Sequence, residues 1–226
     1  RAILAAVLIA VYLGITKQKI PFANIKKEVP LLLASGVAMG VNWIFLFQAY
    51  KYTTVSLATL SYYFAPVIVT VACPFLFKEK LTGKQIICFL MSTAGLVMIT
   101  GIGKIGSNTD FIGILWGLGA AFFYAVVILL NKFIKGVEGI HRTFLQFLSA
   151  IVILIPYVAV TGGVTLGQLH TVGWINLLIV GLLHTDPLVA VVISVTVLGE
   201  SMTVWQSVGG LLILGFTLWN EVSSGT

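Results

Sequence analysis

The chain has 226 residues, of which 59% are apolar and only 9% charged, and its mean hydropathy is +1.09. A soluble domain is typically about 45–50% apolar and about 25% charged, so the composition excludes a soluble enzyme, a nucleic-acid-binding domain and a disordered segment. The net charge of +6 does not indicate an anionic polymer as partner, because the basic residues stand singly or in short groups between apolar runs. The sequence therefore predicts a polytopic membrane protein.

Eight apolar runs, separated by charged or glycine-containing breaks, predict membrane-spanning helices. The runs are too long and continuous for the alternating strands of a membrane barrel. In chain order they are Ala2–Thr16, Val29–Tyr50, Thr53–Phe77, Gln85–Gly103, Phe111–Asn131, Thr143–Gly162, Gly173–Leu198 and Trp205–Val222. The connections between them are too short for a separate soluble domain.

The sequence contains an internal repeat. At an offset of 121 residues four positions recur, the pairs being Pro66 and Pro187, Glu79 and Glu200, Thr82 and Thr203, and Gln85 and Gln206. A weaker match upstream has an offset of 145, so 24 residues of the first half have no counterpart. Either the second half has lost about one span, or these residues are absent between Thr185 and Asp186. We favour their absence, because a deletion would remove half of each of two helices.

Six of the repeated residues have a structural interpretation. Thr82 with Gln85, and Thr203 with Gln206, are capping-box patterns that open the following helix. Glu79 and Glu200 stand just before those helix starts, where a negative charge is favourable. We therefore expect these residues to stabilise the fold rather than to contact a ligand.

The loop charges predict an inverted arrangement of the two repeats. One side of the membrane receives ten Lys and Arg residues and the other receives three, which assigns the first side to the cytoplasm. The turn at residues 78–84 carries three lysines, whereas the corresponding turn at 199–205 carries none. The second turn is therefore expected to face outward, as in the inverted repeats of many transporters.

On these motifs the chain resembles the EamA-type drug/metabolite transporter superfamily. The motifs are Lys78-Glu79-Lys80-Leu81-Thr82…Gln85 in the first copy and Gly199-Glu200-Ser201-Met202-Thr203…Gln206-Ser207-Val208-Gly209 in the second. The first copy departs from the superfamily pattern, with Lys78 in place of a usual glycine and Cys88 in place of the glycine that Gly209 supplies in the second copy.

The resemblance implies an all-α polytopic membrane protein with ten helices in two inverted five-helix repeats. Residues 1–103 would be the first repeat without its first helix. Residues 111–222 would be the second repeat, lacking about 24 residues between 185 and 186. A cavity between the halves would carry the substrate.

Polar and aromatic side chains at membrane depth form the candidate cavity, because polar groups there are costly unless they face protein or water. Asp186 is the acidic residue nearest mid-membrane, and proton coupling, an ammonium contact and a structural hydrogen bond all remain open for it. Pro66 and Pro187 free backbone groups that can line a site. Gln146, nearer a helix end, is less informative. The expected cavity residues are Asn42, Tyr63, Trp116, Tyr124, His184 and Asp186.

These features predict a secondary transporter in the plasma membrane that exports a small neutral or zwitterionic metabolite, such as an amino acid, by alternating access. The alternative is a multidrug exporter of lipophilic cations, attracted by Asp186 and the aromatic rings. A sugar-phosphate exchanger is less favoured because no Lys or Arg lies deep in a span, and a membrane enzyme because catalytic motifs are absent. The expected partners are the substrate, the bilayer and possible coupling protons, with no nucleic acid, metal or cofactor.

Overall fold

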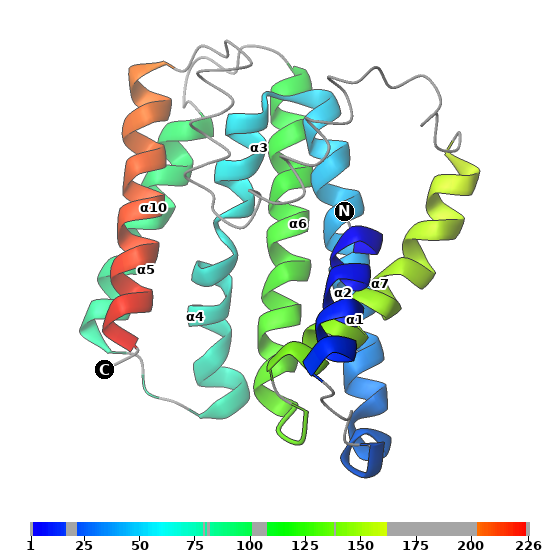
Figure 1. Cartoon of the computed structure of the whole chain (residues 1–226). Coiled ribbons are helices and arrows are strands. Elements are labelled where there is room, and N and C mark those ends of the chain that lie inside the picture. Colours follow the sequence, from blue (N-terminus) through cyan, green and yellow to red (C-terminus); the bar gives the residue numbers. More distant parts are fainter. Residues whose placement is uncertain are drawn as a thin grey trace. The chain divides into compact units, whose positions relative to one another are not determined.

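The computed structural model describes residues 2–16, 22–78, 80, 82–100, 108–137, 139–161 and 203–224. These residues form helices and no strand (Figure 1). Four segments, Lys27–Tyr52, Val55–Phe77, Asp110–Phe133 and Gly139–Val160, are long and apolar enough to cross a membrane. The helices are α1 (Ala2–Thr16), α2 (Phe22–Tyr52), α3 (Val55–Tyr62), α4 (Ala65–Phe77), α5 (Gly83–Thr100), α6 (Asn108–Phe133), α7 (Gly139–Val160) and α10 (Val204–Ser224).

The apolar runs place most of these helices correctly. Helix α1 has the predicted bounds, and α5, α6, α7 and α10 differ from theirs by a few residues at their ends. Helix α2 begins seven residues before the predicted start at Val29. The predicted span Gly173–Leu198 and the junction between Thr185 and Asp186 lie outside the described residues.

The predicted span Thr53–Phe77 corresponds to the apolar segment Val55–Phe77, but the structure divides it into two helices, α3 and α4, in place of one continuous helix. At the break, the N–H of Phe64 donates to the carbonyl of Ser61 at 3.2 Å, one residue short of the α-helical partner. Pro66 has no N–H to donate to the carbonyl of Tyr62, and its ring opposes a continuous helix. Pro66 instead stands in the first turn of α4, where proline is well tolerated.

Both capping boxes form. The N–H of Thr82 donates to Gln85 Oε1 at 2.9 Å, and the N–H of Gln85 donates to Thr82 Oγ1 at 3.3 Å. The corresponding distances for Thr203 and Gln206 are 2.8 and 3.3 Å. The same reciprocal cap therefore opens α5 and α10.

The residue that ends α4 is the one at which the first copy of the motif has Lys78 in place of glycine. Lys78 is the C-cap and has a left-handed backbone, with φ of 55° and ψ of 26°. Glycine adopts this conformation without a steric penalty, whereas another L-residue loses roughly 1–2 kcal/mol there. Lys78 therefore occupies a position whose geometry suits the glycine that the superfamily pattern has.

The chain forms two compact units. Unit 1 comprises Arg1–Val41 and Val126–Thr185, and unit 2 comprises Asn42–Ala125 and Asp186–Thr226. Helices α2 and α6 each contribute to both. Each unit thus combines segments from both predicted repeats, and the repeat boundaries stay a prediction.

A buried polar junction joins three helices in unit 1. Gln146 of α7 donates through Nε2 to Ser35 Oγ of α2 and to Asn131 Oδ1 of α6, at 2.6 Å each. Ser35 and Gln146 are both buried. Arg142 Nη1 also donates to the carbonyl of Asn131 at 3.4 Å. Gln146 is thus the central donor of this junction, although its position in the sequence is not informative.

The Gly36-x-x-x-Gly40 pattern lets α2 approach α7 closely in unit 1. A Cβ at Gly36 would lie 2.7 Å from the carbonyl oxygen of Gln146, and one at Gly40 would lie 3.2 Å from that of Ala150. Small residues at such spacing are typical of close helix packing in membranes. The close approach brings Gln146 within reach of α2.

In unit 2, α5 and α10 pack against each other and run antiparallel (Figure 1). They approach closely at Gly95, where a Cβ would lie 2.6 Å from the carbonyl oxygen of Gly209 and 3.0 Å from Ile213 Cγ1. Beside them lies α3, whose residues from Ser56 to Ser61 are all buried. Leu60 of α3 packs with Ile213 in a core cluster. Helix α3 is therefore enclosed by protein.

Replacing Gly95 by alanine should destabilise the protein, because the new methyl group would force α5 and α10 apart. Overpacking of this kind typically costs about 1–3 kcal/mol. Thermal unfolding of the purified full-length protein in detergent measures the effect.

The matched control is Gly215→Ala on α10, where a Cβ would meet no atom within 4 Å. It should leave stability unchanged or raise it by up to about 1 kcal/mol through better helix propensity. Equal unfolding temperatures for the two variants would contradict the close approach at Gly95.

Candidate substrate site

Three tyrosines gather at the break between α3 and α4 in unit 2. The ring of Tyr62 lies 5.5 Å from that of Tyr63 in a T-shaped contact. It also lies 5.2 Å from the ring of Tyr124 on α6, tilted by 40°. Two of the predicted cavity residues, Tyr63 and Tyr124, are therefore brought together through Tyr62. We call these three residues the tyrosine cluster.

Small residues on α6 allow the tyrosine cluster to form. A Cβ at Gly117 would lie 2.9 Å from Ser61 Cβ and 3.1 Å from the carbonyl oxygen of Ala58, so α6 runs close against α3. Tyr124 lies two turns further along α6 on the same face as Gly117. The ring of Tyr124 can therefore reach Tyr62 at the end of α3.

Two buried side-chain oxygens of predicted or neighbouring membrane-depth residues in unit 2 have no hydrogen-bond partner among the described residues. They are Thr59 Oγ1 on α3 and Asn42 Oδ1 on α2. Asn42 is 1% exposed and Thr59 is 2% exposed. A buried polar atom without a partner typically costs about 1–3 kcal/mol. Such atoms are available to bind water or a polar ligand.

Two other hydroxyl groups in the segment Val55–Phe77 donate hydrogen bonds to backbone carbonyls of the same segment. Ser61 Oγ donates to the carbonyl of Leu57 at 2.8 Å, and Thr70 Oγ1 donates to that of Pro66 at 2.9 Å. These bonds satisfy the hydroxyl groups of Ser61 and Thr70 at membrane depth. Thr59 differs from them because its hydroxyl oxygen has no partner among the described residues. The break also means that Thr59 and Thr70 do not share the face of one continuous helix.

Trp116 belongs to a different aromatic group. Its ring lies 4.8 Å from that of Phe45 on α2, and Phe45 also contacts Phe123 of α6 at 5.2 Å. The structure therefore does not place Trp116 in the tyrosine cluster through any contact described. The predicted site residues His184, Asp186, Pro187, Glu79 and Glu200 lie outside the described residues.

Tyr62 is the site residue that sequence reasoning missed. The expected cavity residues include its neighbour Tyr63 but not Tyr62 itself. The available signal was the Tyr62-Tyr63 pair standing a few residues before Pro66. A proline that ends one helix and starts another places the preceding aromatic residues at a helix terminus.

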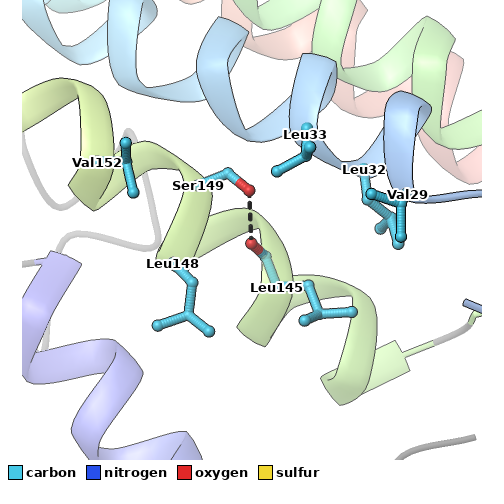
Figure 2. Close-up of a pocket in the computed structure, with 7 residues that line it drawn as sticks. All are labelled: Val29, Leu32, Leu33, Leu145, Leu148, Ser149 and Val152. Carbon is cyan, nitrogen blue, oxygen red and sulfur yellow. Dashed lines mark hydrogen bonds between the residues drawn. The ribbon is translucent and has the colours of Figure 1, made fainter. Parts of the chain in front are cut away.

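A separate, apolar groove lies in unit 1 between α2 and α7 (Figure 2). Its volume is about 270 Å³, below the roughly 300–1,000 Å³ of a pocket for a drug-sized ligand. The Ser149 hydroxyl donates to the carbonyl of Leu145 at 3.0 Å. The groove is lined by Val29, Leu32, Leu33, Leu145, Leu148, Ser149 and Val152.

The tyrosine cluster and the unpartnered atoms suit binding rather than catalysis. Aromatic faces bind cations and apolar groups, and the oxygens of Asn42 and Thr59 can accept hydrogen bonds. Within the ranges that the structure describes, no three His, Cys, Asp or Glu side chains are grouped to hold a metal ion.

Comparisons with known proteins agree with one another. Residues 1–101 match the EamA-like transporter family. The chain is 32% identical to the uncharacterized transporter YxxF of Bacillus subtilis (strain 168), over 83% of this chain and 68% of that protein. It is 24% identical to an uncharacterized transporter of Clostridium kluyveri, over 86% of this chain and 72% of that protein. A solved crystal structure matches with a TM-score of 0.65 over 96% of this chain and 84% of the other, at 14% identity, which shows the fold alone.

Proposed function

This chain belongs to the EamA-like transporter family, and we propose that it exports a small neutral or zwitterionic metabolite, such as an amino acid. It is a multi-pass membrane transporter, and the plasma membrane is the proposed location. The observation that carries the proposal is the interrupted span with its tyrosine cluster.

An interrupted helix at membrane depth favours a substrate site. Backbone that is not helical is tolerated there only where protein or a water-filled cavity surrounds it. Transporters commonly bind their substrates at such discontinuous helices near the middle of the bilayer. The break at Tyr63 and Phe64 lies in the interior of the 23-residue segment Val55–Phe77, which fits this pattern.

The charges around the break favour a substrate without net charge. Residues 52–77 contain no Lys, Arg, Asp or Glu. A phosphorylated substrate would require a buried cation as partner, so a sugar phosphate fits this segment poorly. The hydroxyl of Thr59 and the amide oxygen of Asn42 would bind the polar groups of a zwitterion.

The alternative function is export of lipophilic cations. It is favoured by the tyrosine cluster, because three aromatic rings offer faces to a cation. In both cases Asp186 is the proposed acidic contact or proton-coupling residue, and His184 a proposed cavity residue.

The proposed mechanism is alternating access by two inverted repeats. The antiparallel course of α5 and α10 supports this, because it puts the capping box of Thr82 and Gln85 at the opposite end of the pair from that of Thr203 and Gln206. Repeats related in this way form a cavity that opens to either side when one half rocks against the other.

Transport by full-length protein in proteoliposomes tests the function. Labelled amino acids should leave loaded vesicles, and Tyr62→Ala should weaken apparent affinity by up to about tenfold, since an aromatic contact is worth about 0.5–1.5 kcal/mol. Tyr62→Phe, which keeps the ring, should retain most of the activity.

The control for this experiment is Tyr12→Ala, which removes an exposed tyrosine of α1 and should transport as the unaltered protein does. Efflux of lipophilic cations in place of amino acids would favour the alternative. Exchange of sugar phosphates with no flux of either other class would refute the proposed site.

The proposed inversion predicts opposite sidedness for two equivalent positions. In full-length protein with Cys73 and Cys88 replaced by alanine, Val204→Cys should react with a membrane-impermeant thiol reagent on intact cells. Gly83→Cys should react only after the cells are opened, because the lysine-rich turn is expected in the cytoplasm. Labelling of both positions from the same side would rule out the inverted arrangement.

A further inference from the structure

The apolar groove between α2 and α7 in unit 1 has no role in the proposed transport site. It offers a ligand almost nothing but leucine and valine surface (Figure 2). Its one polar side chain, Ser149, is engaged by the carbonyl of Leu145. A zwitterionic substrate would leave its polar groups unpaired there, at a typical cost of 1–3 kcal/mol each. A ligand that fits this groove must therefore be apolar along its length.

The lining residues indicate an elongated occupant. On α7 they run from Leu145 to Val152, which corresponds to roughly 10 Å along the helix axis. On α2 they run from Val29 to Leu33. The groove thus follows the axes of two helices that cross the bilayer, as an acyl chain does.

One end of the groove is basic. Arg142 precedes Leu145 by one turn of α7, and Lys135 lies beside the start of the α2 wall, because its N–H donates to Glu28 Oε1 at 3.0 Å. Glu28 Oε1 also accepts from the N–H of Gly136 at 2.7 Å, whereas Glu28 Oε2 is buried without a hydrogen-bond partner among the described residues. Among the side chains described at this end, Lys27, Lys132, Lys135 and Arg142 are basic and Glu28 alone is acidic.

We propose that the groove binds one acyl chain of an anionic phospholipid, with the phosphate of the headgroup beside Arg142 and Lys135. The apolar walls exclude water and the basic end complements the phosphate. Basic residues near a membrane surface attract anionic lipids, and basic pockets between helices bind their headgroups. The topology predicted from the loop charges puts this end in the cytoplasmic leaflet.

Native mass spectrometry of the full-length protein in detergent tests the proposal, with dioleoyl phosphatidylglycerol and dioleoyl phosphatidylcholine as probes. Phosphatidylglycerol should bind more tightly. Lys135→Gln should weaken its binding by about fivefold, the effect of one basic residue near a membrane surface. This variant keeps the backbone N–H that Glu28 accepts. Lys51→Gln, an exposed lysine at the end of α2 in unit 2, is the matched control and should have no effect.

The apolar part of the site is tested by filling the groove. Leu33→Trp combined with Leu148→Trp should abolish the bound lipid, whereas Leu90→Trp combined with Leu115→Trp, at similarly exposed leucines outside the groove, should not. Equal binding of the two lipids would overturn the role of the basic end. Equal lipid binding by the two double variants would overturn the groove as the site, as would displacement of the lipid by glycerol phosphate alone. These outcomes do not depend on which substrate is transported.

Discussion

In hydrocarbon, a backbone N–H or C=O has no water to bind, and each one left unpaired costs several kcal/mol. Helices satisfy this constraint along the described chain, and the reciprocal caps at Thr82 and Thr203 satisfy it at the starts of α5 and α10. At the break between α3 and α4 the regular α-helical bonding stops, and the N–H of Phe64 donates to the carbonyl of Ser61. The residues of α3 that precede the break, from Ser56 to Ser61, are buried in protein, and non-helical backbone at membrane depth is tolerated only where protein or water surrounds it.

Enclosing α3 requires close packing by small residues. Gly117 brings α6 against α3, and Gly95 brings α5 against α10 in the same unit. Because lipid tails are as apolar as leucine, such packing and buried hydrogen bonds hold membrane helices together. Gln146 supplies the hydrogen bonds in unit 1, and the tyrosine cluster supplies aromatic contacts at the break. The packing around the candidate site in unit 2 therefore depends on Gly117 and Gly95.

The sequence predicts the features that depend on local pattern. Apolar runs locate the helices, and the Thr-x-x-Gln spacing predicts both caps. Pro66 is visible in the sequence, but the apolar run continues through it, so hydropathy alone predicts a continuous helix. The contacts of Tyr62 and Gln146 are not visible in the sequence, because they depend on residues far along the chain, Tyr124 in one case and Ser35 in the other. Contacts of this kind have no signal in a single sequence.

Substrate binding at the tyrosine cluster requires water to reach the break between α3 and α4. The decisive measurement is the reaction rate of Tyr63→Cys with a water-soluble thiol reagent, in full-length protein whose Cys73 and Cys88 are replaced by alanine. A thiol reacts as its thiolate, so a cysteine in a watery cavity should label readily, and substrate should slow it. Phe122→Cys, at an exposed apolar position of α6, should label slowly in the bilayer. A Tyr63→Cys thiol that reacts no faster than Phe122→Cys would show that the break is dry and would contradict the account.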